Sequence, residues 1–135
     1  MTSDPLSGER HVALREFVRR FDWRLVVLFG SLARGGPGRD VDLAVLPAVE
    51  TALMEQGNWQ ARLEDLFTPW PVDLLLLNDA LPPLTRFEIF RDGRCLFEAQ
   101  EGLFSREQDR AFFLYADSEK FRQATREVLR GRAPG

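Results

Sequence analysis

Three aspartates stand in segments that are otherwise apolar: Asp40 and Asp42 in the stretch DVDLAVL, and Asp73 in PVDLLLL. Side chains alternate between the two faces of a strand, so Asp40 and Asp42 project to the same face, about 7 Å apart. Carboxylate oxygens select hard ions, and the pattern therefore favours Mg²⁺ or Mn²⁺ over zinc, with Asp73 as a third ligand if its strand lies alongside. The alternative is structural: Asp40 begins a strand after a glycine-rich loop, and Asp73 pairs with an arginine.

The segment just upstream of the first two acids has the residue types that bind a phosphate. Gly30-Ser31 ends the apolar run 25–29 and opens a predicted helical turn. Such a turn offers backbone N–H groups and a hydroxyl, and Gly30 has no side chain to block the approach of an anion. Arg34, one turn later, either reaches the phosphate or pairs with one of the acids. A phosphate site beside a carboxylate metal site is what phosphoryl or nucleotidyl transfer requires.

Two other phosphate-binding motifs are excluded by the residues present. Lys120 is the only lysine in the chain, so no Gly-Lys-Ser/Thr loop exists. Gly36-Pro37-Gly38 begins like a dinucleotide-binding motif, but Val41 stands where its third glycine belongs.

The elements that must hold these residues alternate between strand and helix. Residues 1–9 are predicted to be a loose tail, and Leu14, Phe17, Val18 and Phe21 form one face of a helix. A capping box of Ser105 and Gln108 is predicted to open a C-terminal helix over residues 104–131. This order favours a single α/β layer domain spanning residues 1–135. The remaining predictions are strands at 25–29, 40–46, 72–77 and 94–97, and helices at 51–67, where Leu53, Trp59, Leu63, Leu66 and Phe67 form a stripe, and at 83–90.

The amino-acid composition limits which binding partners the chain is expected to have. The formal net charge is −3, which argues against stable, nonspecific nucleic-acid binding. Cys95 is the only cysteine, so neither an intrachain disulfide nor a cysteine-based zinc site can form, and we expect it in the core. The first twenty residues lack an apolar segment, and no run is long enough to cross a membrane. We therefore expect a cytoplasmic protein without a membrane partner.

The stretch LFGSLARG at 28–35, followed by DVDL at 40–43 and by the later Asp73, resembles the DNA polymerase β-like nucleotidyltransferase superfamily. The segments 81–84 and 87–98 also resemble its smallest members, the minimal nucleotidyltransferases of the MntA antitoxin type. This resemblance, over roughly residues 14–130, implies an α/β (α+β) nucleotidyltransferase fold with a mixed sheet of about four to five strands flanked by helices. It implies that the catalytic and metal-binding residues are Asp40, Asp42 and Asp73, and it agrees with nucleotide binding by Gly30, Ser31 and Arg34.

The function implied by the resemblance is metal-dependent transfer of AMP from ATP to a hydroxyl. The expected acceptor is a tyrosine of a HEPN-domain ribonuclease toxin, which gives the chain the role of an antitoxin. Two alternatives remain: an antitoxin of the same fold, weakened in catalysis, that acts by occlusion, and an aminoglycoside-like enzyme with a small-molecule acceptor. The segment between Ser31 and Asp40 is two residues shorter than is usual in the family, which keeps the occlusion alternative open.

Overall fold

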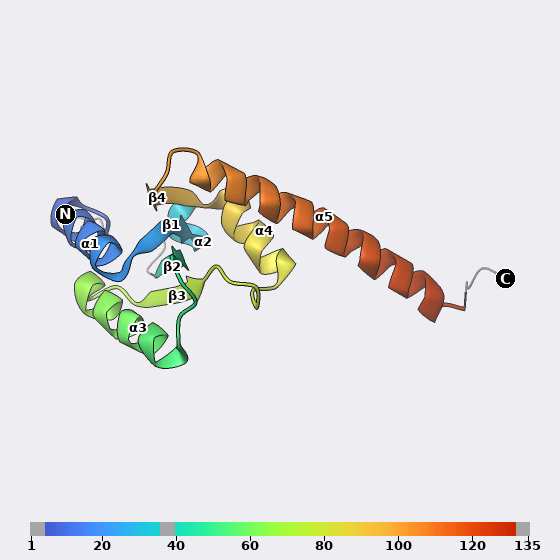
Figure 1. The fold of residues 1–135 in the computed structure, drawn as a ribbon, viewed down its shortest axis with the longest axis horizontal. Coiled ribbons are helices and arrows are strands. Elements are labelled where there is room, and N and C mark those ends of the chain that lie inside the picture. Colours follow the sequence, from blue (N-terminus) through green and yellow to red (C-terminus); the bar gives the residue numbers. More distant parts are fainter. Residues whose placement is uncertain (1–4, 36–39, 132–135) are drawn as a thin grey trace.

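A four-stranded mixed sheet forms the centre of the molecule and carries helices on both faces (Figure 1). The computed structural model describes residues 5–35 and 40–131. The strand order is β3-β2-β1-β4; β1 is antiparallel to both of its neighbours, whereas β2 and β3 are parallel. The predicted α/β (α+β) class and the mixed sheet are confirmed. The strands are β1 (Trp23–Phe29), β2 (Val41–Pro47), β3 (Val72–Leu76) and β4 (Arg94–Glu98), and the helices are α1 (Gly8–Phe21), α2 (Gly30–Ala33), α3 (Leu53–Phe67), α4 (Pro83–Asp92) and α5 (Leu103–Leu129).

Two apolar layers bury the two faces of the sheet. On one face, α1 and α3 pack against alternate residues of the strands, such as Leu43 of β2, and the Trp23 and Trp59 rings meet edge to face at 5.3 Å. On the opposite face, α4 and α5 cover Ala44 of β2 and the matching residues of β1. Central strands that are buried on both faces consist of continuous apolar runs, and this is why the sequence could predict these strands.

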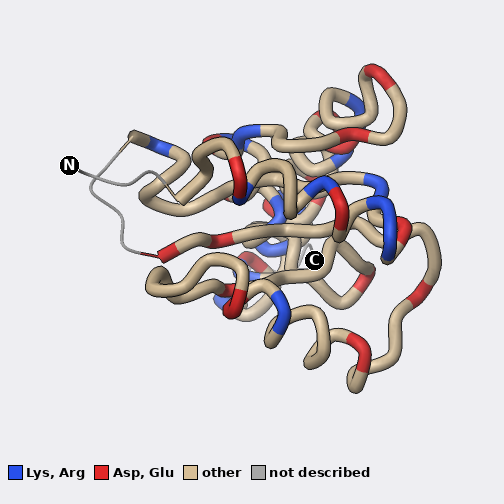
Figure 2. Tube along the Cα trace, turned by 90° about the vertical axis from the view of Figure 1, so that its left-hand side faces the viewer, with Lys and Arg blue, Asp and Glu red and all other residues tan. Residues whose placement is uncertain are grey.

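The charged residues of the molecule are mixed in sign. Along the trace, acidic and basic positions are interspersed over the body and do not form a band of one sign (Figure 2). In the described residues, no helix is both long enough and apolar enough to cross a membrane.

The prediction of a loose tail over residues 1–9 is wrong for the part that the structure describes. Helix α1 begins at Gly8, and the backbone N–H groups of Arg10 and His11 both donate to the carbonyl of Ser7. Pro5 is buried, so this segment is part of the fold. Glu9 in the first turn favours the helix start through the helix dipole. Residues 1–4 lie outside the described residues.

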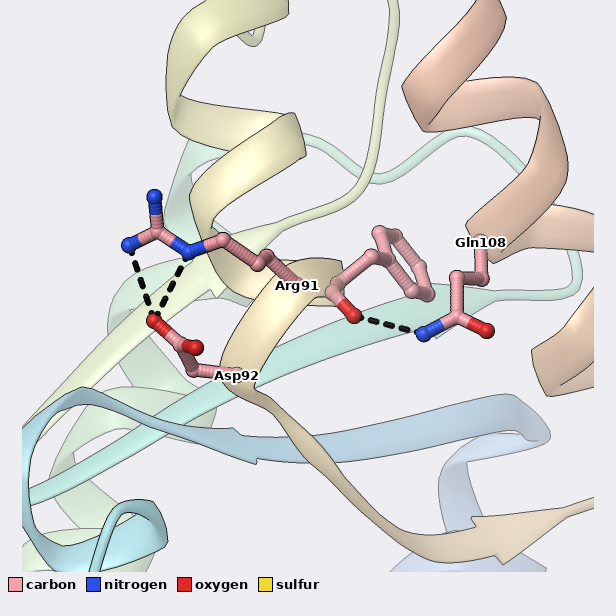
Figure 3. Close-up of polar contacts among 4 residues, drawn as sticks. Arg91, Asp92 and Gln108 are labelled. Carbon is pink, nitrogen blue, oxygen red and sulfur yellow. Dashed lines mark hydrogen bonds and ion pairs between the residues drawn. The ribbon is translucent and has the colours of Figure 1, made fainter.

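The C-terminal helix is confirmed within two residues of its predicted bounds, but the predicted capping box is wrong. Gly102 precedes α5 in a left-handed conformation, with φ at 87°. The cap comes from β4, because the Glu98 carboxylate accepts the N–H groups of Gly102 and Phe104 at 3.3 and 2.9 Å. Gln108 instead donates its Nε2 to the Phe90 carbonyl at 2.8 Å, which ties α5 to the end of α4 (Figure 3).

Two apolar residues are more exposed than predicted. Leu53 begins α3 and is 82% exposed, so the buried stripe of this helix consists of Trp59, Leu63 and Phe67. Cys95 is exposed and does not belong to the core. The exposure of Cys95 has a topological reason, because β4 is an edge strand and its first residues have a neighbouring strand on one side only.

Gly93 allows α4 to return closely onto the sheet, and this makes it a sensitive position. A Cβ at Gly93 would overlap the Ile89 carbonyl oxygen and lie 2.6 Å from Val27 Cγ1. We expect Gly93→Ala to lower the free energy of unfolding by about 2 kcal/mol or more, as overpacking does. Gly57→Ala is the matched control, because a Cβ in this exposed part of α3 meets no atom within 4 Å in the part of the chain that the structure describes. It should stabilise the chain by about 0.5–1 kcal/mol. Urea denaturation measures both; equal effects would contradict the close packing at Gly93.

Candidate functional site

Strand pairing brings the predicted acids to one end of the sheet. Asp42 of β2 is in register with Asp73 of β3 across the parallel pair. Partners in register on neighbouring strands project to the same face, here the face covered by α4 and α5. The Val41 N–H donates to the Pro71 carbonyl at 2.8 Å and opens the parallel ladder at this level. Asp40 lies just before β2 and is exposed.

The Gly30 backbone packs directly against the carboxylate of Asp42. In the antiparallel pair, Asp42 lies opposite Phe29, the last residue of β1. Gly30 follows with φ at +78°, a conformation that favours glycine, and the chain turns into α2. A Cβ at Gly30 would coincide with the space of Asp42 Oδ2. The predicted turn at Gly30-Ser31 is thus present, and its glycine is required by the neighbouring acid.

The acids interact electrostatically. Partial burial raises the pKa of the Asp42 carboxyl above its ordinary value, and the charges of Asp73 and then Asp40 raise it further. Arg34 acts in the opposite direction and lowers it. Two carboxylates that raise the pKa of a third create a negative potential, and a bound cation would offset it. The all-oxygen donor set fits a hard divalent ion.

The three acids do not form a closed cluster. Within residues 5–35 and 40–131, no group of three or more His, Cys, Asp or Glu side chains is gathered closely enough to hold a metal ion. Asp73 is exposed, whereas Asp42 is partly buried against Gly30. The assignment of the metal to Asp40, Asp42 and Asp73 therefore stays a prediction, as does nucleotide binding by Gly30, Ser31 and Arg34.

Arg34 and Ser31 lie at the α2 turn next to these acids. Both are exposed, and the Arg34 N–H donates to the Ser31 carbonyl at 3.2 Å. The charge of Arg34 acts on Asp42 and also on Asp92, yet it forms a direct ion pair with neither. Asp92 instead accepts two hydrogen bonds from Arg91 at 3.0 and 2.8 Å, and this pairing lowers its pKa (Figure 3). The guanidinium of Arg34 is therefore not held in an ion pair by Asp42 or Asp92.

Sequence reasoning missed Gln60, which fixes the strand that carries Asp73. The Gln60 Nε2 of α3 donates to the Val72 carbonyl at 2.6 Å, and its Oε1 accepts the Leu74 N–H at 3.1 Å. One amide thus holds the backbone on both sides of Asp73, on the free edge of β3. No spacing rule marks this residue, because the contact joins two elements that only the tertiary fold brings together.

A surface cavity of about 600 Å³ lies at the opposite ends of the same strands. It is lined by residues that follow β2 and β3, including Glu50, Asn78 and Asp79. Asp40, Asp42, Asp73 and the α2 turn are not among the residues that line this cavity. The chemistry-bearing residues thus gather at the amino ends of the parallel pair.

Comparison with known proteins matches this geometry to a family. The model described as "Polymerase beta, Nucleotidyltransferase" matches residues 14–102, a span that includes the α2 turn and all three acids. The chain belongs to this nucleotidyltransferase family. A search of the curated proteins gives no match.

Solved structures share the fold of this nucleotidyltransferase. A toxin–antitoxin structure with AMP-PNP is 20% identical, with a TM-score of 0.74 over 88% of this chain and 97% of that one. A complex of a tri-AMPylated Shewanella oneidensis HEPN toxin with an MNT antitoxin is 19% identical, with a TM-score of 0.71 and 89% and 95% covered. The MntA–HepT toxin–antitoxin is 18% identical, with a TM-score of 0.70 and 89% and 96% covered. At these identities the similarity establishes the fold.

Gly30→Ala tests the contact between the turn and the acid. The variant adds the strain of a left-handed alanine and displaces the Asp42 carboxylate. Gly35→Ala is the matched control, because Gly35 has the same φ of +78° but its Cβ would meet no atom of the described residues within 4 Å. We expect Gly35→Ala to cost about 1 kcal/mol of stability and Gly30→Ala clearly more. Combining Gly30→Ala with Asp42→Ala should recover part of the loss in thermal denaturation; no recovery would contradict the contact.

Asp42→Asn tests the electrostatic cost of the site in metal-free buffer. A carboxyl whose folded-state pKa is raised contributes stability only in acid, and that contribution is lost as the pH rises through the raised pKa. The variant should therefore have an unchanged or slightly higher Tm than the parent at pH 7, and the difference should vanish in acid. Asp65→Asn, an exposed position on α3, should leave Tm unchanged at both pH values. A large drop in Tm for Asp42→Asn would instead identify a structural role.

Proposed function

We propose that this nucleotidyltransferase moves AMP from ATP to a hydroxyl group and that the acceptor is a tyrosine of a HEPN-domain ribonuclease toxin. The observation that carries the proposal is the register of Asp42 with Asp73 beside the Gly30 turn. Family membership supports nucleotidyl transfer as the chemistry. An antitoxin role is supported by the fold shared with the MNT antitoxin, whose toxin partner is AMPylated.

Each residue has a role that follows from its place. Asp40, Asp42 and Asp73 would hold Mg²⁺ or Mn²⁺, which neutralises charge on the phosphate oxygens when bound. In the proposed reaction, the backbone N–H groups at Gly30 and Ser31 bind the phosphate, and Arg34, which forms no ion pair with another described residue, supplies a positive charge beside it. The absence of a side chain at Gly30 leaves room for the Asp42 carboxylate, because a Cβ there would overlap Asp42 Oδ2.

Asp73 is the general base of the proposed reaction. It is the more exposed member of the pair in register, so an incoming hydroxyl can reach it. The tyrosine oxygen attacks the α-phosphorus of ATP while Asp73 takes the hydroxyl proton. The new oxygen–phosphorus bond forms as the bond to the bridging oxygen breaks, and pyrophosphate leaves.

Occlusion without catalysis is the second candidate. The segment between Ser31 and Asp40 favours it, because it is two residues shorter than is usual in the family and joins the proposed phosphate-binding turn to the acids. Residues 36–39 of that segment lie outside the described residues. A small-molecule acceptor is favoured by no feature of the site.

A transfer assay tests the proposal and separates the candidates. The chain is incubated with ATP, Mg²⁺ and the product of the neighbouring reading frame, which the proposal expects to be a HEPN-domain protein, and intact mass reports adenylate on the acceptor. The parent chain should add adenylate, whereas Asp73→Ala should bind the acceptor yet transfer at least about 100-fold more slowly. Asp79→Ala, an exposed aspartate beyond the far end of β3, is the matched control and should behave like the parent. Neutralisation of the toxin without any adduct would overturn transfer and favour occlusion.

A further inference from the structure

Asp73 stands on the outermost strand of the sheet, whereas Asp42 stands on a strand with neighbours on both sides. The β1–β2 register and the contact with Gly30 hold Asp42 in place. Strand β3 has β2 on one side only, and α3 lies alongside it (Figure 1). Unpaired backbone groups along a sheet edge leave a strand more open to local unfolding. The position of Asp73 therefore depends on what holds the free edge of β3.

The backbone groups of β3 point alternately to β2 and to this free edge. The Pro71 carbonyl accepts a hydrogen bond from β2 and the Leu77 N–H donates one to it, so the odd-numbered residues of the segment turn their backbone groups to β2. Val72 and Leu74 turn theirs to the edge. There the Gln60 Nε2 donates to the Val72 carbonyl at 2.6 Å, and the Gln60 Oε1 accepts the Leu74 N–H at 3.1 Å. One amide thus takes the place of a neighbouring strand.

These two hydrogen bonds hold the backbone torsion angles of Asp73. The Val72 carbonyl belongs to the peptide plane that precedes the Asp73 Cα, and the Leu74 N–H belongs to the plane that follows it. Only φ and ψ of Asp73 lie between these two planes, so an amide that holds both planes holds both angles. The angles set the direction of the Cα–Cβ bond, and with it the direction in which the carboxylate leaves the strand.

Gln60 reaches β3 from a fixed position on α3. Trp59, the residue before it, is 4% exposed, and Leu63, about one turn later, is fully buried. Both belong to the apolar layer between α3 and the sheet, and Gln60 lies half-buried beside them. The packing of α3 therefore fixes the helix backbone at Gln60 relative to the strand that its amide holds.

We propose that Gln60 is a positioning residue for Asp73 and that, through the two peptide planes, it directs the Asp73 carboxylate to the metal and to the acceptor hydroxyl. This inference rests on the proposed function, in which Asp73 is a metal ligand and the general base. Gln60 acts through the backbone of β3 and needs no contact with the reacting atoms. A displacement of about 1 Å in a reacting group can slow an enzymatic step about 100-fold.

Gln60→Met tests the inference, because methionine has a similar length and helix propensity but cannot donate a hydrogen bond. In the transfer assay at saturating Mg²⁺, kcat should fall at least about 10-fold while KM for ATP stays unchanged. Without ATP or acceptor, the affinity for Mn²⁺, measured by electron paramagnetic resonance, should fall about 10-fold, as it does when the support of a metal ligand is lost. Amide exchange measured by NMR should be about five-fold faster or more at the Leu74 N–H.

Two other variants of α3 serve as controls. Gln56→Met carries the same substitution one turn earlier, where the amide donates to the Thr51 carbonyl at 3.4 Å, and it should match the parent in all measurements. Leu63→Val removes one methylene from the core and lowers Tm, but leaves both hydrogen bonds of Gln60 intact. The kcat of this variant and its affinity for Mn²⁺ should match those of the parent at a temperature where it is folded.

The outcomes separate this inference from the proposed function. Unchanged exchange at Leu74 in Gln60→Met overturns the positioning role, and so does a loss of kcat that Leu63→Val reproduces. Faster exchange with parent-like kcat and Mn²⁺ affinity also overturns it and leaves Gln60 as cover for the strand edge. Weaker Mn²⁺ binding in Gln60→Met, with no adenylate transferred by the parent chain, supports the positioning role and overturns the transfer. A parent chain that neither binds Mn²⁺ nor transfers adenylate overturns both.

Discussion

The contact between the Gly30 backbone and the Asp42 carboxylate is the constraint on which this end of the molecule depends. Because Asp42 lies opposite Phe29, the chain must leave β1 at the next residue without a side chain. A positive φ at that residue turns the backbone into α2 and places Ser31 and Arg34 beside the acid. The register of β1 and β2, the turn at Gly30 and the position of Asp42 thus depend on one another, and a change in one requires a change in the others.

This arrangement has an electrostatic cost that the rest of the fold offsets. Burial and two neighbouring carboxylates raise the pKa of Asp42, so its charged form is disfavoured in the folded chain. The sheet beneath it is buried on both faces by apolar side chains, and this burial supplies the stability. Arg91 pairs with Asp92, which leaves Arg34 without an ion pair to either acid. Such unrelieved charge is typical of functional sites.

Local patterns predicted the elements, and the acids could be found because polar residues in apolar strands stand out. Features that depend on contacts distant in sequence could not be predicted. The cap of α5 comes from Glu98 on a preceding strand, and Gln60 grips the backbone around Asp73 from α3. The exposure of Cys95 follows from the edge position of β4. The exposure of α5 from residue 120 to residue 130 was equally hidden, because periodicity describes a face and not its neighbour.

The strand order also has a kinetic meaning. Gly30 and Asp42 belong to antiparallel neighbours that follow one another in the chain, so they meet by closing a short segment. Asp73 arrives on a parallel strand after the crossover through α3, and that closure sacrifices more chain entropy. The Gly30 turn and the first two acids are therefore expected to assemble early in folding. The third acid joins when α3 docks, and the Gln60 amide then holds the new edge in place.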